Sequence, residues 1–209
     1  MIDPVMLGQG LALAAGYLLG SIPSAIWICK LFYRTDITKV GSGNPGMTNV
    51  LRTLGWKPAL PVALLDAGKG LVAAWLGLRL GGSVAWGLAA GAAAVLGHSF
   101  TCFASFRGGK GVLTGWGIFL FFTPASALAS LAVWAAVVAA SRYVSLGSIA
   151  GSLVLPGSIL LEARLQGKTG LAPILSAAVL VCAFVLFRHR ENMLRLVRGT
   201  KDKIGGRTS

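Results

Sequence analysis

A glycine-rich segment, GSGNPG at residues 41–46, has the composition of an anion-binding turn. Its glycines can adopt positive φ without steric cost, so that successive backbone amides can point into one concavity and hold an anion. The residues around it add polar donors and, at Arg52, a planar guanidinium suited to phosphate; they are Ser42, Asn44, Thr48, Asn49 and Arg52. The segment therefore predicts a phosphate site, with a mobile Gly-Asn-Pro-Gly turn as the alternative.

The same letters match the dinucleotide fingerprint G-x-G-x-x-G, but their context argues against a nucleotide. That fingerprint must follow a β-strand and open a helix in a βαβ unit, whereas here it follows YRTDITK and lies between two apolar stretches. A Walker-type loop requires lysine where this chain has Met47. We therefore do not expect ATP or a dinucleotide to bind here.

Two further clusters have the chemistry of phosphate binding. In FRGGKGV, residues 106–112, three glycines surround Lys110 just before an expected helix start, where free N–H groups and the helix dipole favour anions. In FRHRENMLRLVRG, residues 187–199, a histidine, a glutamate and an asparagine stand together directly after an apolar stretch. Attraction of basic residues to anionic headgroups, at about 1 kcal/mol each, explains Arg195, Arg198, Lys201 and Lys203 but not why His189, Glu191 and Asn192 stand together.

Other polar residues allow more than one interpretation. Ser145 and Ser148 are three residues apart and can face one side of a helix. Asp66 and Lys69, spaced i, i+3 within an apolar stretch, are either a functional pair or a structural ion pair. His98 can bond a neighbouring helix or contact substrate; neither His98 nor His189 has an aspartate five positions later, so the His-x4-Asp dyad of soluble glycerolipid acyltransferases is absent.

The elements that position these clusters must be membrane helices. Of the 209 residues, 55% are hydrophobic and only 12% are charged, and the mean hydropathy is +0.76. Soluble domains have about 25% charged residues. We attribute the net charge of +13 to basic cytoplasmic loops rather than to nucleic-acid binding. The three cysteines lack C-x-x-C spacing and indicate neither a metal nor a disulfide.

We predict an all-α integral membrane protein, a bundle of seven transmembrane helices with the N-terminus outside and the C-terminus in the cytoplasm. The basic loop at residues 107–110 and the basic tail lie on the same side only if an even number of spans separates them, which requires a hairpin near Thr123-Pro124. The expected outer loops then contain only Arg79, Arg164 and Lys168. The fourth span is too short to cross alone and must be buried, and Gly87 and Gly91 suit close helix packing. The apolar stretches run at about 5–32, 58–78, 84–103, 112–122, 125–141, 144–161 and 171–187. We expect one membrane-embedded domain over residues 1–209, in which residues 197–209 form a flexible basic tail.

Taken in order, these segments resemble the acyl-phosphate:glycerol-3-phosphate acyltransferases, the PlsY family of bacterial membranes. The similar motifs are GSIPSAIW with Lys30, GSGNPGMTNVLR, DAGKG, GH, FRGGKGV, RYVSLGSI and HRENMLRL, and they cover nearly the whole chain. The chain departs from the family pattern in its tail, where Gly199-Thr200-Lys201 replaces G-x-E.

The resemblance implies transfer of an acyl group from acyl phosphate to the 1-hydroxyl of sn-glycerol 3-phosphate, giving lysophosphatidate and phosphate, the first acylation of phospholipid synthesis. It implies no cofactor and no metal, a cytoplasm-facing site in the bacterial inner membrane, and a substrate phosphate as proton acceptor. It places phosphate and substrate binding at Ser42, Asn44, Arg52, Lys110, Ser148, His189 and Asn192. The clusters add Gly43, Asn49, Gly109 and Arg190 as substrate-binding candidates, and we expect Lys110, His189 and Asn192 to be catalytic.

The expected partners are acyl phosphate, glycerol 3-phosphate and the lipid bilayer, with a soluble acyl-phosphate-forming enzyme as a further candidate and no nucleic acid. The main alternative function is an organic-phosphate transporter. Transporters place their site near the bilayer midplane and often contain inverted repeats, whereas here the cations gather at one expected face and no repeat is visible. A non-catalytic lipid-binding protein would need only the basic tail.

Overall fold

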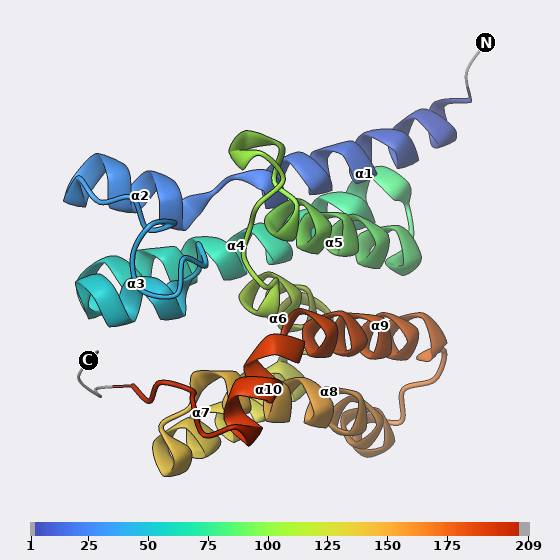
Figure 1. Cartoon of the computed structure of the whole chain (residues 1–209). Helices are drawn as coiled ribbons and strands as arrows, with labels where there is room; N and C mark the ends of the chain where they lie inside the picture. The colour runs from blue at the N-terminus through green and yellow to red at the C-terminus, as the bar shows by residue number, and fades with distance from the viewer. Residues whose placement is uncertain (1–2, 205–209) are drawn as a thin grey trace. The chain divides into compact units, whose positions relative to one another are not determined.

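The computed structural model describes residues 3–204, and the regular structure of these residues is entirely helical (Figure 1). The chain forms two compact units, Met1–Phe121 (unit 1) and Phe122–Ser209 (unit 2). Each unit is described by itself below. The expectation of a single domain stays a prediction.

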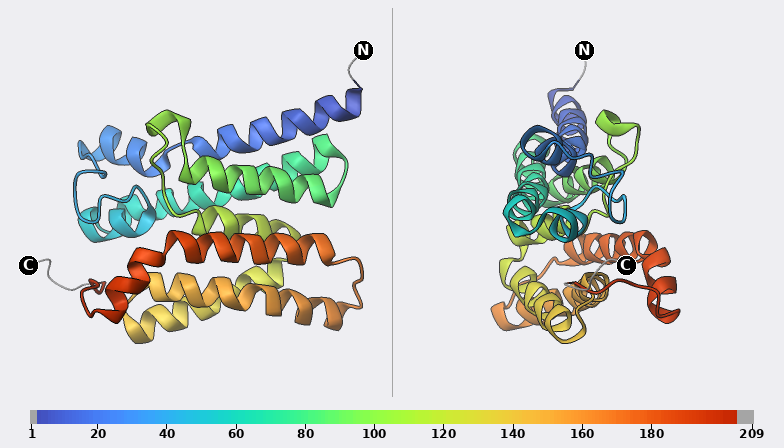
Figure 2. Two further views of the ribbon diagram at one scale, coloured as in Figure 1. Left: turned by 45° about the vertical axis from the view of Figure 1, so that its right-hand side comes forward. Right: turned by 60° about the vertical axis from the view of Figure 1, so that its left-hand side comes forward.

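Unit 1 contains six α-helices and a short 3₁₀ turn. In Figure 2, α1, α4 and α5 lie side by side, and they form the closest helix pairs of this unit. The elements are α1 (Pro4–Ser21), α2 (Ser24–Tyr33), α3 (Met47–Leu54), α4 (Trp56–Gly81), α5 (Val84–Ser99), η1 (Cys102–Ala104) and α6 (Val112–Phe122).

The first apolar stretch is two helices, which corrects the single span expected over residues 5–32. Pro23 has no N–H and its ring disfavours helical geometry at the preceding residue, so the helix stops at Ser21 and restarts at Ser24. Two carbonyl groups at the break have side-chain donors from elsewhere in unit 1. The Thr101 hydroxyl donates to the carbonyl of Ser21, and Lys69 Nζ donates to the carbonyl of Ile22 at 2.9 Å.

A second correction concerns the segment that follows. We expected residues 33–57 to be a loop, but α3 occupies residues 47–54 within it. This short helix buries Asn49 and Val50 and packs against α4. Its apolar side joins a small core that includes Cys29, Ile37 and Val62.

Small residues allow the helices of unit 1 to approach closely, as predicted for α5. A Cβ at Gly20 of α1 would collide with the backbone of Ala94, and one at Gly91 would lie within 2.8 Å of Ile118 in α6. Close backbone approach of this kind is the usual way in which membrane helices pack.

Unit 2 consists of α7 (Pro124–Ser141), α8 (Val144–Gln166), α9 (Ala172–Arg188) and α10 (Arg190–Val197). α7 and α8 pack on each other, and α8 also contacts α9. Near the start of α7, the buried Glu162 of α8 accepts hydrogen bonds from the backbone N–H (2.9 Å) and the hydroxyl of Ser126. This carboxylate therefore satisfies one of the free N–H groups at that helix start.

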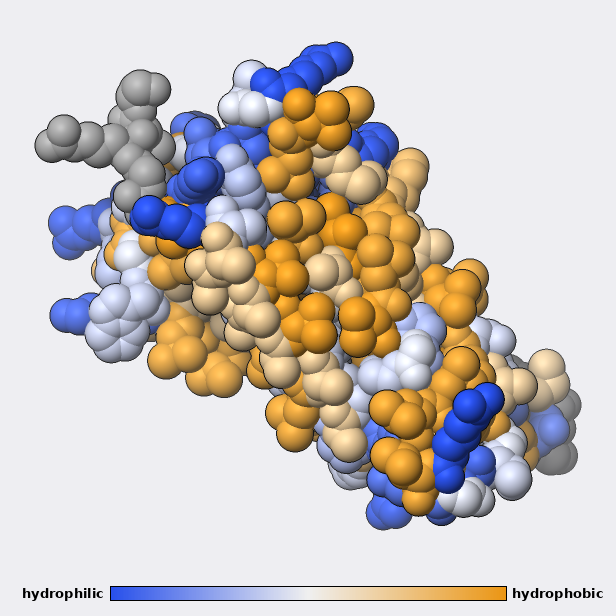
Figure 3. All heavy atoms as spheres, turned by 90° about the horizontal axis from the view of Figure 1, so that it is seen from below, coloured by the Kyte–Doolittle hydropathy of each residue, from blue (hydrophilic) through white to orange (hydrophobic). Residues whose placement is uncertain are grey.

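Five segments among the described residues are long and apolar enough to cross a membrane: Pro4–Tyr33, Trp56–Gly81, Val84–Ala104, Pro124–Ser141 and Val144–Gln166. A sixth is added if α9 and α10, which are bent by 55° at their junction, count as one. Figure 3 shows a broad hydrophobic band on one face, and large apolar side chains such as Leu153 and Leu180 are exposed. The chain is thus a multi-pass membrane protein, as predicted.

The fourth expected span is the short helix α6. It ends at Phe122 and α7 begins at Pro124, so the predicted break near Thr123-Pro124 is present. Its 11 residues span about 16 Å, about half the hydrocarbon core. Thr114, Gly117 and Phe119 are buried within the protein, as we expected of a helix too short to cross alone. Seven crossings and the orientation of the termini stay predictions.

Candidate active site

The first glycine loop, residues 41–46, is held by the side chain of Asn49. Asn49 is 2% exposed; its Nδ2 donates to the carbonyl groups of Ile37 and Val40, both at 3.0 Å, and its Oδ1 accepts from the Ser42 amide at 2.9 Å. Gly41 and Gly43 have φ of +58° and +67°, values that glycine adopts without strain. Asn49 therefore positions the loop, and its predicted contact with substrate stays a prediction.

Several amides of the first glycine loop are already used within the protein. The Gly43 amide donates to the carbonyl of Val40 at 3.1 Å, and the Gly46 amide donates to that of Asn44 at 2.9 Å. α3 begins directly after the loop. Asn44 of the loop and Arg52 of α3 are both half-buried. The donors best placed for an anion are therefore side chains and the first turn of α3.

The segment between α2 and the loop is fixed by Asp36. Its Oδ1 accepts from the Thr38 hydroxyl at 2.6 Å and the Thr38 amide at 3.2 Å, and its Oδ2 lies 3.9 Å from Lys30 Nζ. The Thr38 hydroxyl, followed by its amide, holds the pKa of this partly exposed carboxyl below its ordinary value. Asp36 is therefore ionised at neutral pH and orders the approach to the loop.

The second glycine loop, residues 108–111, is held by backbone groups at the end of α5. The Gly108 amide donates to the carbonyl of Ser99 and the Gly109 amide to that of His98, both at 3.1 Å. Our expectation that this turn presents these two amides to an anion is therefore wrong for Gly108 and Gly109. The positive charge of the loop lies on the half-buried Lys110, which precedes Gly111 (φ +76°) and the start of α6.

Both glycine loops border one hollow within unit 1. The hollow is small, with room for about one water molecule, and Pro45 of the first loop and Gly109 of the second line it. The other lining residues are Pro23, Ser24, Ile26, Asp66, His98, Thr101, Arg107 and Gly108. The structure thus brings together two segments more than 60 residues apart that the sequence had singled out separately.

Asp66 and His98 meet in the wall of this hollow. Asp66 Oδ1 lies 2.9 Å from Lys69 Nζ and 3.6 Å from His98 Nδ1, and all three side chains are buried. The Asp66–Lys69 ion pair was one of the alternatives that the sequence left open. Contact of His98 with a neighbouring helix was likewise one of the alternatives left open, although the sequence did not identify Asp66 of α4 as the partner.

In unit 2, His189 lies at the junction of α9 and α10. It is 3% exposed, and its Nδ1 lies 2.8 Å from the carbonyl oxygen of Val185. Because a carbonyl oxygen can only accept, Nδ1 carries the hydrogen in this contact. His189 is thus fixed in one tautomer.

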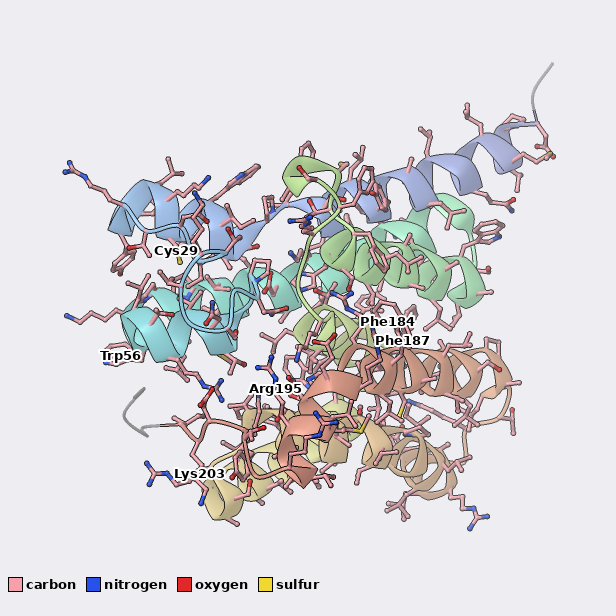
Figure 4. The ribbon with its side chains drawn as sticks, viewed as in Figure 1. Cys29, Trp56, Phe184, Phe187, Arg195 and Lys203 are labelled. Atoms are coloured by element: carbon pink, nitrogen blue, oxygen red, sulfur yellow. The ribbon has the colours of Figure 1, made fainter. Side chains whose placement is uncertain are left out.

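Asn192 lies on the first turn of α10 and is contacted by the tail. Its Oδ1 accepts from Lys201 Nζ at 3.3 Å. The Ile204 amide donates to the carbonyl of Arg142 at 2.9 Å, and Lys203 lies over the Tyr143 ring at 5.6 Å (Lys203 is labelled in Figure 4). The beginning of the predicted flexible tail is therefore bound to the turn between α7 and α8; residues 205–209 lie outside the described residues.

The remaining predicted residues of unit 2 have local partners. Arg190 is exposed; it donates to the carbonyl of Phe187 at 3.1 Å, and its guanidinium lies 4.4 Å from the centre of that ring. Ser148 is buried on α8, where its hydroxyl donates to the carbonyl of Val144 at 3.0 Å. The hydroxyl of the nearby Ser145 is buried and has no hydrogen-bond partner within residues 3–204.

Sequence reasoning missed two features that belong with these clusters. Lys201 was grouped with the headgroup-binding basic residues, and its contact with Asn192 was not expected. For His98, contact with a neighbouring helix was one alternative, but Asp66, 32 positions away, was not identified as the partner. No group of three or more His, Cys, Asp or Glu residues in the described part of the chain could hold a metal ion.

The described residues define an all-helical, multi-pass membrane protein with two glycine loops, one beside Arg52 and the other containing Lys110. The family model described as glycerol-3-phosphate acyltransferase matches residues 10–199. A relative from Deinococcus radiodurans, glycerol-3-phosphate acyltransferase 1, is 40% identical over 95% of this chain and 97% of its own length.

Solved structures give the same result. A crystal structure of PlsY (YgiH), an integral membrane glycerol 3-phosphate acyltransferase in its glycerol 3-phosphate form, has a TM-score of 0.84 and 36% identity, covering 94% of this chain and 96% of that one. The lysphosphatidic acid form of PlsY has a TM-score of 0.82 and 35% identity, covering 94% and 95%. The chain belongs to the glycerol-3-phosphate acyltransferase family, and it is an enzyme, a membrane-embedded acyltransferase.

Proposed function

We propose that this enzyme transfers an acyl group from an acyl phosphate to the 1-hydroxyl of sn-glycerol 3-phosphate. The products are lysophosphatidate and inorganic phosphate, and the reaction is the first acylation of phospholipid synthesis. The observation that carries the proposal is the match to the glycerol 3-phosphate form of PlsY over 94% of this chain.

The charge of the site supports an acyl phosphate as the donor. An acyl phosphate carries its own leaving group, so catalysis requires positioning and charge stabilisation rather than a covalent intermediate. Unit 1 provides Arg52 beside the first glycine loop and Lys110 within the second. These are groups that bind phosphate and stabilise an oxyanion.

In the proposed reaction the glycerol hydroxyl oxygen attacks the acyl carbon, and the bond from that carbon to the phosphate oxygen breaks. The hydroxyl proton passes to a phosphate oxygen, and inorganic phosphate leaves. Lys110 stabilises the developing negative charge. In unit 1, we propose Ser42, Asn44, Asn49 and Arg52 as further phosphate and substrate ligands; Gly43 and Gly109 are left out because their amides bond within the protein. In unit 2, we propose Ser148, His189, Arg190 and Asn192.

To this set we add Lys201, because its ammonium group is already bonded to Asn192. Lys201→Met should raise the KM for glycerol 3-phosphate about tenfold, since a charge-assisted hydrogen bond to phosphate is lost. Lys203→Met, which removes the neighbouring tail cation over Tyr143, is the matched control and should leave this KM unchanged. Equal KM values for the two variants would contradict a role for Lys201.

The proposed topology has seven crossings, with the N-terminus outside and both glycine loops facing the cytoplasm of the bacterial inner membrane. The basic loops support it, because Lys and Arg concentrate on the cytoplasmic side of membrane proteins. Cysteines introduced at Lys39 and Lys168 test the orientation. A membrane-impermeant thiol reagent added to whole cells should label the second and not the first, and the reverse would overturn the orientation.

Purified protein in lipid, supplied with glycerol 3-phosphate and either acyl phosphate or acyl-CoA, tests the reaction. We expect lysophosphatidate, identified by mass spectrometry, with acyl phosphate alone. The absence of product with both donors would overturn the proposal. Uptake of glycerol 3-phosphate into proteoliposomes without acylation would favour the phosphate transporter instead.

A further inference from the structure

Asp66 and Lys69 place two opposite charges inside the apolar helix α4. Asp66 lies about 15 Å along the helix axis from Trp56, at the start of α4. The side chains of Asp66 and Lys69 are 4% and 6% exposed. Ionisable residues at such positions are costly in a membrane and mark functional positions. Their partners therefore indicate what the charges do.

Lys69 connects α4 to the break in the first span. Its Nζ lies 2.9 Å from Asp66 Oδ1 and donates to the carbonyl of Ile22, also at 2.9 Å. That carbonyl lies at the interruption between α1 and α2. A break in a membrane helix is tolerated only where its backbone groups find partners within the protein, and Lys69 is such a partner.

Asp66 connects α4 to the second glycine loop through His98. His98 Nδ1 lies 3.6 Å from Asp66 Oδ1, and the Nε2 side of the same ring abuts Gly109, where any Cβ would collide with it. The backbone of His98 also takes part, because its carbonyl accepts from the Gly109 amide at 3.1 Å. His98 is therefore confined between a carboxylate and the residue that precedes Lys110.

We propose that Asp66, Lys69 and His98 form a positioning cluster that fixes the Lys110 turn relative to the break at Ile22–Pro23. Lys110 is then held in one orientation toward the reacting phosphate. The three residues act on the reaction through Lys110 and do not touch substrate. The proposal rests on the proposed acyl transfer, in which Lys110 stabilises negative charge. A displacement of about 1 Å at such a group can lower a rate about 100-fold.

The decisive variant is the double substitution Asp66→Asn/Lys69→Met in the full-length protein in lipid. It removes both charges together, so that no isolated charge stays buried. Glu162→Gln is the matched control, since it removes a buried carboxylate from unit 2, far along the chain from the cluster. Three readouts are compared with the wild type: melting temperature, kcat and KM for acylation, and the rate at which an amine reagent labels Lys110 without substrate.

We expect the double variant and Glu162→Gln to melt within a few degrees of each other. The double variant alone should lose kcat about 100-fold, with KM for glycerol 3-phosphate changed less than about threefold, and Lys110 should be labelled faster. If the double variant does not fold, the same three readouts are measured on His98→Asn, which keeps the Asp66–Lys69 pair. Wild-type kcat or unchanged labelling in the variant that folds overturns the proposal.

The outcome separates this inference from the proposed function. If the wild-type protein does not acylate glycerol 3-phosphate, the proposed function fails, and the cluster is judged by labelling alone. Faster labelling of Lys110 would then support the cluster, and an unchanged rate would overturn it.

Discussion

The two glycine loops of unit 1 look alike in sequence but differ in what their glycines provide. In the first loop, Gly41 and Gly43 provide backbone conformation, with φ of +58° and +67°. In the second loop, Gly108 and Gly109 lie outside the left-handed region and provide space, because a Cβ at either would collide with the end of α5. Gly108 and Gly109 therefore meet a steric requirement, unlike Gly41 and Gly43, whereas Gly111 at the end of the second loop also has positive φ (+76°).

The loops differ equally in what holds them. A single buried side chain, Asn49, bonds three backbone groups of the segment around the first loop. The second loop pairs with the carbonyl groups of His98 and Ser99. In both loops, several backbone N–H groups already donate to acceptors within the protein. In the proposed function, phosphate binding therefore depends chiefly on the cation of each loop region, Arg52 or Lys110.

Removal of these two cations should give the largest effect. Arg52→Ala and Lys110→Ala should each lower kcat/KM about 100- to 1,000-fold, because each removes a fixed donor from a site where charge develops. The measurement is acylation by purified protein, with insertion checked by size-exclusion chromatography. Lys57→Ala, an exposed cation near the first loop, is the control and should keep wild-type activity. Full activity of Arg52→Ala would separate the first loop from the reaction.

The next largest effect should come from Asn49, which has no side-chain counterpart in the second loop. Asn49→Leu leaves buried carbonyl groups at Ile37 and Val40 without their donor and should lower stability by about 2–3 kcal/mol. Asn49→Asp keeps the acceptor for the Ser42 amide, but it places a buried carboxylate oxygen against the carbonyl oxygens of Ile37 and Val40, so its effect should be at least as large as that of leucine. Thermal unfolding in detergent measures both, and an unchanged melting temperature for Asn49→Leu would show that the loop is held otherwise.

Alanine and asparagine substitutions should rank in opposite order at the glycines of the two loops, with effects of about 1–2 kcal/mol on stability. At Gly43 the requirement is positive φ, so Gly43→Asn should be tolerated better than Gly43→Ala, since asparagine adopts this conformation more readily. At Gly109 the requirement is space beside His98, so Gly109→Asn should be worse than Gly109→Ala. Melting temperatures of the four variants test this order, and the same order at both sites would remove the distinction.

The smallest effect concerns the approach to the first loop and depends on pH. The Thr38 hydroxyl lowers the pKa of Asp36, so this carboxylate adds stability that is present above the unfolded pKa and is lost as the pH falls through the lower folded pKa. Thr38→Val should therefore lower the melting temperature at pH 7, and the difference from the wild type should shrink below about pH 4. A difference that does not vary with pH would contradict this account.

The sequence predicted the helices well where apolar length and proline decide. The short helix α6 and the break before Pro124 follow from too few apolar residues for two full spans and from the position of the proline. Pro23 carried the same signal, but the continuous apolar composition around it hid the break. α3 was missed because its apolar residues fit one side of a short helix, a pattern that is weak over eight residues.

The residue types of the candidate site could be predicted from the sequence, but the contacts among these residues could not. Arg52, Lys110 and His189 stand out in short polar segments, so their residue types were sufficient. The partners of Asp66, the contact of Lys201 with Asn192 and the pairing of the Gly108 and Gly109 amides all join distant positions or backbone groups. Such contacts depend on how helices pack, which spacing along one chain does not encode.

The most direct test of the account is the stoichiometry of a single reaction mixture. Wild-type protein in lipid, given acyl phosphate and glycerol 3-phosphate, is followed for both inorganic phosphate and lysophosphatidate. The account predicts that the two products appear in equal amounts, that neither forms at an appreciable rate with Lys110→Ala, and that acyl-CoA does not replace the donor. Lysophosphatidate formed from acyl-CoA, or formed without release of phosphate, would contradict it.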